Sequence, residues 1–344
     1  MFDSRIKKYF EISNGAPLLL NGSDVNSYYF TGQHFSEDCW ILIEHDCVTV
    51  FSSILDGFTS TNTYSVIQTG FNGLLEGLSN VKNLNLPLDS VDALHFKKIS
   101  ASLKNPLLLN DFSNELKKQR SIKDEREVEI IKKACEETRN VFQFLKELNE
   151  TEIGLEVQLK KTLWESGLEE SFKPIFAFGR NSSIPHHVNS KKSWEEGEVK
   201  LYDLGVKLED YCSDMTFTVF PEKMSERLQK LKMVLENVFG LALKECKAGV
   251  KASDLHLKVE NYINSTEFKG KFIHSLGHSL GLKVHDGLVI SRNSDWILEE
   301  GMVVTLEPGI YDSLVYGIGD SNTSGQGGRI EVDVLVRKDD CIAL

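Results

Sequence analysis

The chain has 344 residues, of which 41 % are hydrophobic and 26 % charged, and it carries a formal net charge of −12. Nucleic acids and anionic membranes are bound through an excess of Lys and Arg, so this acidic balance argues against both as partners. The length and composition are typical of a globular protein with two domains.

Targeting and redox features indicate a cytoplasmic protein. Residues 1–15 lack the apolar core of a signal peptide, and no window reaches the roughly 18 unbroken apolar residues of a membrane span. The six cysteines include no C-x-x-C pair, which favours reduced thiols over a disulfide framework. We therefore expect neither secretion nor membrane insertion.

Residues 1 to about 115 alternate between helix-like and strand-like segments. Such alternation predicts a small α/β domain. The expected elements are a strand at 17–22, two strands within 39–53 and an amphipathic helix over 64–78, while 92–105 is left open between helix and strand.

A long, charged and periodic segment, 112–150, follows this region. Its apolar stripe predicts a helix, with Ser121 as the expected N-cap and with Asp124 and Glu125 complementing the positive helix N-terminus. We place the domain boundary near residue 118, ahead of this helix.

The pattern of hydrophobic and polar residues changes from about residue 171. From there strand-like runs dominate, and helical segments interrupt them. This pattern predicts an α+β region. The expected strands lie within 173–179, 199–206, 211–220, 302–311 and 327–336, and the expected helices within 151–167, 221–249 and 252–265.

Two aspartates occupy strand-like positions in the segment 199–220. A hairpin turn centred on Leu208 and Glu209 places Asp203 directly opposite Asp214. Aspartate is disfavoured in strands and opposed like charges destabilise a sheet, so a cation between the two would explain them. The alternative, that both aspartates lie at strand ends or in turns, stays open at this point.

Two glutamates occupy apolar runs in the same way. Glu307 ends the run VVTLE, and Glu331 lies inside GGRIEVDVLV. A buried carboxylate is costly unless it is paired, protonated or bound to a metal. Arg329, on the same strand face as Glu331, either orients a metal-ligating carboxylate or simply pairs with it.

Three histidines lie in the segment 273–286. His274 and His278 are four residues apart, as two zinc ligands on one helix would be, but Ser275 stands where the H-E-x-x-H motif requires glutamate. Two glycines also disfavour a helix here. The sequence therefore does not predict a zinc-binding helix, and a segment of strand and loop is expected.

Charge balance indicates two metal ions. Asp203, Asp214, Glu307 and Glu331 together carry −4, which two divalent cations would neutralise. A neutral imidazole from His278 would complete a mixed oxygen and nitrogen donor set, which suits Mn, Co, Fe or Zn better than Ca. Paired metals of this kind hold a bridging hydroxide and polarise a carbonyl in aminopeptidases.

Five motifs resemble those of the pita-bread metallopeptidases, specifically the Xaa-Pro branch of prolidase (Xaa-Pro dipeptidase) and aminopeptidase P. They are FGRNSSIPH, DLGVKLEDYCSDMTFT, HSLGHSLGLKVHD, TLEPGIY and GGRIE. The resemblance covers residues 119–344 strongly, and residues 1–118 resemble the creatinase/prolidase-type N-terminal domain more weakly. It implies an α/β N-terminal domain followed by an α+β pita-bread catalytic domain.

The resemblance also implies two divalent metal ions, with Mn first and Co, Zn or Fe as alternatives. The implied ligands are Asp203, Asp214, His278, Glu307 and Glu331. Among the catalytic residues, the resemblance implies that His274 and His285 hold substrate and stabilise the reacting carbonyl, and that His186 lies on the far side of the pocket. Glu307 would also be the general base, and Arg329 would support the ligands from behind.

Several positions depart from the family pattern. Phe217 replaces an arginine, Asp210 and Ser279 each replace a glycine, and Asp286 replaces a glutamate. None of these changes removes a ligand. Phe217 is expected to alter packing and Ser279 to narrow the pocket, while His187, which has no family counterpart, is expected to face solvent.

The sequence thus predicts a dinuclear-metal exopeptidase that hydrolyses the Xaa-Pro bond of short proline-containing peptides by attack of a metal-bridging hydroxide. Aminopeptidase and dipeptidase versions both fit, because the group that would pair with a dipeptide's carboxylate cannot be placed. A creatinase-like, metal-independent hydrolase and a non-catalytic peptide- or protein-binding module on the same fold are the alternatives. The resemblance implies a homodimer formed through the N-terminal domain.

Overall fold

The structure is a computed structural model of the chain, and it describes residues 2–79, 81–103, 109–312 and 325–344. The chain divides into two compact units, Met1–Arg120 and Ser121–Leu344. The boundary expected near residue 118 lies within α5 (Ser113–Ser121), the helix that reaches this division. Of the helices in the described ranges, none combines the length and the apolar composition that crossing a bilayer requires.

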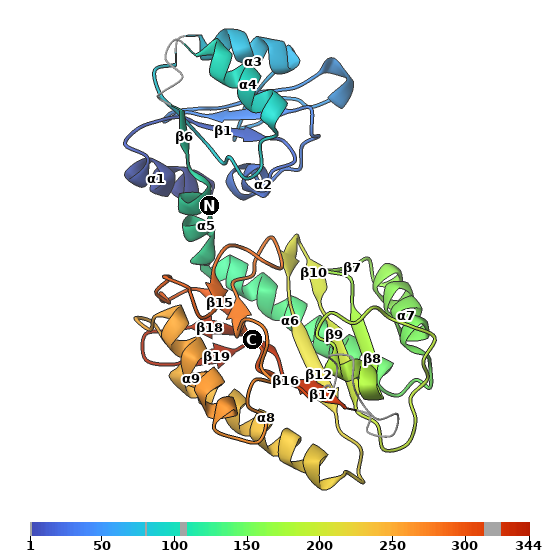
Figure 1. Cartoon of the computed structure of the whole chain (residues 1–344). Helices are drawn as coiled ribbons and strands as arrows, with labels where there is room; N and C mark the ends of the chain where they lie inside the picture. The colour runs from blue at the N-terminus through green and yellow to red at the C-terminus, as the bar shows by residue number, and fades with distance from the viewer. Residues whose placement is uncertain (1, 80, 104–108, 313–324) are drawn as a thin grey trace. The chain divides into compact units, whose positions relative to one another are not determined.

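The first unit is built on a mixed six-stranded sheet with the strand order β4-β3-β2-β1-β5-β6. β1, β5 and β6 run parallel, whereas β1, β2 and β3 pair antiparallel. α3 and α4 cover one face of the sheet, and α1 and α2 lie on the other (Figure 1). The elements before α5 are α1 (Phe2–Ile12), β1 (Leu18–Asn21), α2 (Val25–Thr31), β2 (Trp40–Ile43), β3 (Val48–Phe51), η1 (Ile54–Asp56), β4 (Ser65–Ile67), α3 (Gly70–Leu78), β5 (Leu84–Leu86), α4 (Ala93–Ser102) and β6 (Leu109–Asp111).

The single helix expected over 64–78 is wrong in its first part. Residues Ser65–Ile67 form β4, which pairs in parallel with β3, and α3 begins only at Gly70. Two β-branched residues in this stretch suit a strand, so pairing with β3 decides the local structure. The strands expected at 17–22 and within 39–53 are confirmed, and 92–105, left open by the sequence, forms α4.

The second unit places two pairs of helices against several short sheets (Figure 1). α6 and α7 share an apolar core with β8, β9 and β10, and α8 and α9 share a second core with β14, β15, β16 and β18. The elements are α6 (Glu125–Leu145), α7 (Glu152–Glu165), β7 (Glu169–Glu170), β8 (Ile175–Phe178), η3 (Gly179–Ser183), β9 (Lys200–Leu204), β10 (Val206–Leu208), β11 (Tyr211–Cys212), β12 (Met215–Val219), α8 (Glu226–Glu245), α9 (Ala252–Asn264), β13 (Gly277–His278), β14 (Val289–Ile290), β15 (Val303–Leu306), β16 (Gly309–Tyr311), β17 (Gly327–Arg329), β18 (Val332–Val336) and β19 (Cys341–Ala343).

The charged segment 112–150 forms two helices rather than one. Ser121 is the last residue of α5, and Asp124, not Ser121, is the N-cap of α6. The Asp124 carboxylate accepts a hydrogen bond from the Glu127 N–H (2.9 Å), and the Glu127 carboxylate accepts one from the Asp124 N–H (2.9 Å). This reciprocal capping box satisfies two backbone donors at once and so fixes the start of α6.

The hairpin that carries the two aspartates turns one residue later than expected. Glu209 and Asp210 form its turn, with φ angles of 45° and 69°. In this register Asp203 lies opposite Thr216, so the predicted cross-strand pair of Asp203 and Asp214 is wrong. Two-residue hairpin turns with both φ angles positive match the twist of the strands, which favours this register. Asp214 lies in the connection between β11 and β12.

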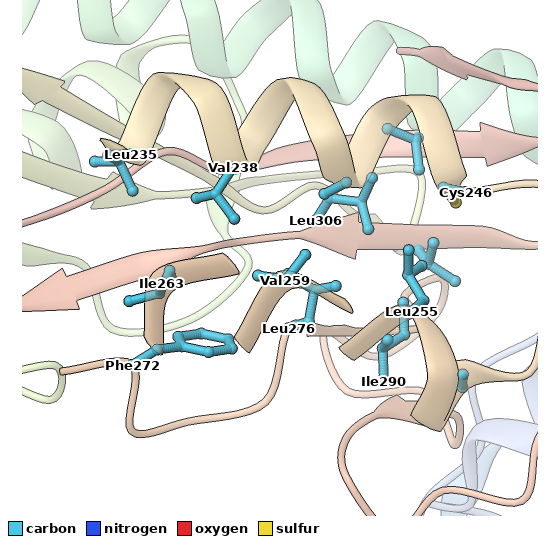
Figure 2. Close-up of a cluster of buried hydrophobic side chains, with 14 of the residues drawn as sticks. Leu235, Val238, Cys246, Leu255, Val259, Ile263, Phe272, Leu276, Ile290 and Leu306 are labelled. Atoms are coloured by element: carbon cyan, nitrogen blue, oxygen red, sulfur yellow. The ribbon is translucent and has the colours of Figure 1, made fainter. Parts of the chain in front are cut away.

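A buried leucine anchors each of two segments that lead into the cleft described below. Leu276 and Leu306 belong to the apolar cluster formed with α8 and α9 and are fully buried (Figure 2). Side chains alternate along an extended chain, so Glu307 points away from the cluster that holds Leu306. The Glu307 N–H donates to the Leu276 carbonyl oxygen (2.8 Å), which fastens the two segments together.

Gly277 lets β13 lie against β15. A Cβ atom at Gly277 would be 2.0 Å from the carbonyl oxygen of Thr305, a distance that the backbone cannot accommodate without moving. The next residue depends on this approach, because the His278 N–H donates to the Thr305 Oγ1 (3.1 Å). Glycine at 277 therefore positions the His278 backbone.

We expect Gly277→Ala to lower the free energy of unfolding by about 1–3 kcal/mol, because the added methyl forces β13 away from β15. Urea unfolding measures the change. Gly240→Ala is the matched control: its Cβ would meet nothing within 4 Å, and it lies inside α8, where alanine is the better helix former. Gly277→Ala unfolding at the wild-type urea concentration would contradict the close approach.

Glu152 is a fully buried carboxylate at the start of α7. Its Oε1 accepts hydrogen bonds from the Phe178 N–H (2.9 Å) and the Asn181 Nδ2 (2.8 Å). Its Oε2 accepts from the N–H (2.9 Å) and the hydroxyl (2.6 Å) of Ser190. Burial by itself raises the pKa of the Glu152 carboxyl, but these hydrogen bonds together outweigh it and lower the pKa below its ordinary value.

The expectation that His187 faces solvent is wrong. Its side chain is 10 % exposed, and its Nε2 lies 2.8 Å from the Glu152 Oε2. Glu152 thus holds the residues on both sides of His186, and through them the loop that carries His186. A sequence pattern gives no sign of this contact, because the two residues are 35 positions apart.

We expect Glu152→Gln to lower the free energy of unfolding at pH 7 by about 1–3 kcal/mol, because an amide nitrogen cannot accept hydrogen bonds. A carboxyl whose pKa is lowered by folding stabilises the protein above its unfolded-state pKa, and this contribution is lost as the pH falls through the folded-state value. The difference between wild type and variant should therefore be full at pH 7 and shrink below about pH 4.3. Urea unfolding across this range measures it.

Glu165→Gln provides the control for this experiment. Glu165 is the last residue of α7 and its side chain is 65 % exposed, so its removal should change the free energy of unfolding at pH 7 by less than about 0.5 kcal/mol. A difference between wild type and Glu152→Gln that stayed constant into acid would show that the ionised carboxylate is not what stabilises the loop.

Candidate metal centre

All nine residues that the sequence singled out line one cleft of about 460 Å³ in the second unit. Five separate chain segments contribute them, so the tertiary structure brings together residues up to 145 positions apart. They are His186, Asp203, Asp214, His274, His278, His285, Glu307, Arg329 and Glu331.

Three of the five expected ligands form the tightest group. Asp214, His278 and Glu331 are buried, and each offers one ligand atom such that the three atoms lie within 4.8 Å of one another. The His278 Nε2 is 3.5 Å from the Asp214 Oδ2 and 3.8 Å from the Glu307 Oε1. Asp203 lies on β9. Together with Asp214, Glu307 and Glu331 it forms the group of carboxylates that we call the acidic floor of the cleft.

Arg329 ties this floor together. Its Nη2 donates to the Asp203 Oδ2 (2.5 Å), its Nε donates to the Thr216 hydroxyl (2.8 Å), and the guanidinium is 4 % exposed. The Thr216 hydroxyl in turn donates to the Glu331 Oε2 (2.6 Å), which lies 3.6 Å from the Arg329 Nε. Arg329 therefore orients Asp203 directly, and it reaches Glu331 chiefly through Thr216.

The electrostatics of the floor call for additional positive charge. Burial raises the pKa values of Asp203, Asp214 and Glu331. Neighbouring carboxylates raise the pKa values of Asp214 and Glu331 further. The positive charge of Arg329 opposes the increase in the pKa of Asp203. Burial also raises the pKa of Glu307 to about 7. The Asp203 Oδ1 is buried and accepts no hydrogen bond from the residues that the structure describes. Clustered carboxylates with an unused oxygen fit divalent cations.

The state of His278 also fits a metal ligand. Burial, and then the neighbouring His285, lower the pKa of His278 to about 3, so the ring is neutral and one nitrogen is free to bind a cation. Its Nδ1 lies 3.3 Å from the Ser279 carbonyl oxygen, which leaves the Nε2 directed at the carboxylates. The His285 ring packs against it, with the ring centroids 4.1 Å apart.

His274 differs from His278 in its surroundings. A carbonyl oxygen can only accept, so the His274 Nδ1, 2.7 Å from the Ser275 oxygen, carries the proton. The His274 Nε2 then accepts from the Tyr311 hydroxyl (2.9 Å), which itself accepts from the Arg329 Nη1 (2.6 Å). Burial lowers the pKa of His274 to about 3. With both nitrogens engaged, His274 is poorly placed to bind a metal.

Sequence reasoning missed a buried carboxylate behind the floor. Asp333 on β18 is fully buried, and its Oδ2 accepts from the Asp214 N–H (2.9 Å) and from the Cys135 thiol (3.1 Å). It lies two residues after Glu331 in the same apolar run, so the signal that identified Glu331 applied to it as well. Asp333 lies opposite Thr305 in the pairing of β15 with β18. Asp333 accepts a hydrogen bond from the backbone of Asp214, and Thr305 accepts one from the backbone of His278.

The departures from the family pattern leave the expected ligands in place. Phe217 stacks on Phe142 with ring centroids 3.9 Å apart, so it serves packing as expected. The expectation that Ser279 narrows the pocket is wrong, because its buried hydroxyl accepts from the Leu288 N–H (3.0 Å) and does not line the cleft. Asp210 lies in the turn before β11.

Comparisons with known proteins agree with this geometry. Residues 129–338 match metallopeptidase family M24. The chain is 29 % identical to the Xaa-Pro dipeptidase of Pyrococcus horikoshii, over 98 % of this chain and 95 % of that protein. The structure of the prolidase from Pyrococcus furiosus matches with a TM-score of 0.84 at 26 % identity, over 98 % of both chains. The X-Pro aminopeptidase structure from Thermotoga maritima matches with a TM-score of 0.83 at 28 % identity, over 98 % of this chain and 97 % of that one.

These likenesses extend over both units. They confirm the predicted fold class, an α/β N-terminal domain followed by an α+β pita-bread domain, and the predicted resemblance to the Xaa-Pro branch. The family match covers more than half of the sequence and includes every expected metal ligand. The chain therefore belongs to metallopeptidase family M24.

Proposed function

We propose that the protein is a dinuclear-metal exopeptidase that hydrolyses the Xaa-Pro bond of short proline-containing peptides. The observation that carries this proposal is the convergence of Asp203, Asp214, His278, Glu307 and Glu331 on the floor of one cleft. The names of the relatives, Xaa-Pro dipeptidase and X-Pro aminopeptidase, supply the substrate class.

The donor set supports two divalent cations. Four carboxylates and one neutral imidazole give a mixed oxygen and nitrogen site that suits Mn, Co, Fe or Zn. The family resemblance puts Mn first. When bound, such ions lower the pKa of a water molecule to near neutrality and polarise the scissile carbonyl. Asp203, Asp214, His278, Glu307 and Glu331 would hold them.

The remaining cleft residues would act on the substrate. Glu307 is the proposed general base: its carboxylate would accept a proton from the attacking water and pass that proton to the departing proline nitrogen. His186, His274 and His285 surround the cleft and would bind the peptide and the reacting carbonyl oxygen. Arg329 would keep Asp203 oriented and His274 in one tautomer through Tyr311.

A cytoplasmic homodimer without nucleic-acid or membrane partners stays part of the proposal. The acidic composition supports the absence of nucleic acid. The dimer rests on the family resemblance described above. Light scattering of the purified protein would measure the mass: twice 38.8 kDa supports the dimer, and 38.8 kDa overturns it.

Removing the metal should abolish hydrolysis of an Xaa-Pro peptide, because the buried carboxylates alone cannot activate water. We expect dialysis against a chelator, with elemental analysis to verify metal loss, to eliminate activity, and Mn to restore it. The melting temperature should rise with added Mn, because a ligand that binds only the folded state stabilises it.

Two outcomes would favour the alternatives. Full activity of a verified metal-free protein would indicate creatinase-like, metal-independent chemistry. A protein that retains no metal and hydrolyses no proline peptide after addition of Mn, Co, Zn or Fe would indicate a binding module.

The three histidines of the segment 273–286 should differ in what their loss removes. His278→Ala should lose bound metal, because its free imidazole nitrogen faces Asp214 and Glu307. His274→Ala and His285→Ala should keep metal but lower kcat by about 10²-fold or more, in the range typical of groups that act in proton transfer or oxyanion binding. Metal content by elemental analysis, measured beside kcat, decides this. Equal metal loss in all three variants would show that the division of roles is wrong.

A further inference from the structure

We propose that Lys173 binds the C-terminal carboxylate of the substrate, and that the preferred substrate is therefore a dipeptide that ends in proline. This inference rests on the proposed Xaa-Pro peptidase function and assigns the group that the sequence could not place. Lys173 lies in the wall of the same cleft as the expected metal ligands.

The charges of the cleft single out Lys173. Among the described lining residues, the lysines and arginines are Lys173 and Arg329. The guanidinium of Arg329 is already committed to Asp203, Thr216 and Tyr311. Lys173 forms no ion pair with the residues that the structure describes, and it is exposed. Its ammonium group is thus the cation of the wall that remains available to an incoming anion.

Glu156, a carboxylate on which the charge of Lys173 acts, already has two hydrogen-bond donors. Burial raises the pKa of Glu156, but hydrogen bonds from Lys160 and Asn189 lower it below its ordinary value, and the charge of Lys173 adds a smaller lowering effect. However, the Glu156 carboxylate already accepts from the Lys160 Nζ (2.9 Å) and from the Asn189 Nδ2 (2.7 Å). Lys173 adds a longer-range attraction to this carboxylate without contacting it as an ion pair.

The backbone holds Lys173 in place. It precedes Pro174, and a residue before proline is restricted to extended conformations. The Asn189 side chain then clamps the next residues, donating to the Pro174 carbonyl oxygen (3.0 Å) and accepting from the Phe176 N–H (2.8 Å). β8 begins directly afterwards, with Ile175 opposite Asp203 of the metal floor. Lys173 therefore precedes Ile175, the residue that lies opposite Asp203, by two positions.

A dipeptide places its carboxylate close to the scissile carbonyl. In an Xaa-Pro dipeptide only the proline N and Cα separate the carbonyl carbon from the carboxylate carbon. The lysine stem of four methylenes is flexible, so the Lys173 ammonium can move to meet an anion inside the cleft that it lines. In a longer peptide the same site would meet a neutral amide, which offers no charge to the ammonium.

The other lining residues suit a proline ring between the metal floor and Lys173. Phe172, Ile175 and Pro185 line the cleft together with Lys173, and Val284 and Val289 come from the His285 segment. Apolar walls with a few placed polar groups are typical of small-molecule sites. The nearby Arg292 is not an alternative carboxylate partner, because it pairs with Glu260 (2.5 Å) and does not line the cleft.

The test compares Ala-Pro with its amide, Ala-Pro-NH2, and with Ala-Pro-Ala on the Mn-loaded enzyme. Wild type should hydrolyse Ala-Pro with the highest kcat/KM. Lys173→Met should lower kcat/KM for Ala-Pro by about five- to tenfold, chiefly through KM, since a partly exposed ion pair contributes modestly. The same variant should leave the amide unchanged, and Lys173→Arg should retain most of the preference for Ala-Pro.

Lys191→Met is the matched control, because it removes the same charge from an exposed lysine that does not line the cleft. It should behave as wild type. An equal fall for Ala-Pro and its amide in Lys173→Met, or no fall for either, would overturn the assignment. A wild type that prefers Ala-Pro-Ala would overturn the dipeptide preference.

A binding measurement separates this inference from the proposed function. Calorimetry with a reduced-bond analogue of Ala-Pro, as the free acid and as the amide, needs no turnover. Wild type should bind the acid about fivefold more tightly than the amide, and Lys173→Met should bind both alike. If wild type hydrolyses none of the three peptides, the proposed function fails, while the acid-to-amide binding ratio still decides the role of Lys173.

Discussion

The guanidinium of Arg329 holds the acidic floor of the cleft together. Several buried carboxylates meet there, and each raises the proton affinity of its neighbours. Arg329 contacts Asp203 directly and Glu331 mainly through Thr216, so it sets their geometry, but one positive charge cannot balance four negative ones. The remaining negative charge calls for bound cations. This requirement is consistent with the chain's membership of a metallopeptidase family.

The scaffold positions the floor by placing apolar anchors beside polar residues. Leu306 is buried in the core with α8 and α9, and the next residue, Glu307, points into the cleft. Behind the ligands, Asp333 accepts a hydrogen bond from the Asp214 N–H, and Thr305 accepts one from the His278 N–H. The ligands are thus held through their main chain as well as their side chains, which leaves little freedom for the donor atoms to rearrange.

Some expectations failed where a contact over a long sequence distance decided the outcome. His187 was expected at the surface, but it bonds to Glu152 at the start of α7, and no local pattern reports a partner 35 residues away. Residues Ser65–Ile67 were assigned to a helix because pairing with β3 is invisible to periodicity. The wrong register removed the cross-strand argument for Asp203 and Asp214, but the family motifs had identified the same two residues. The argument for Glu307 and Glu331 rested on the cost of buried charge and did not depend on which strand residue lies opposite.

By itself, the sequence determined the fold class and the set of residues that share the cleft. Carboxylates inside apolar runs of the sequence are a chemical anomaly that any register preserves, and three of the five motifs contain them. Only the tertiary structure decided which group each of these residues touches: Arg329 contacts Asp203, Tyr311 contacts His274, and Asp333 contacts the backbone of Asp214. It also placed Lys173 among the residues that line the cleft. Hydrogen bonds depend on differences of a few tenths of an ångström, and a turn that shifts by one residue moves every such partner.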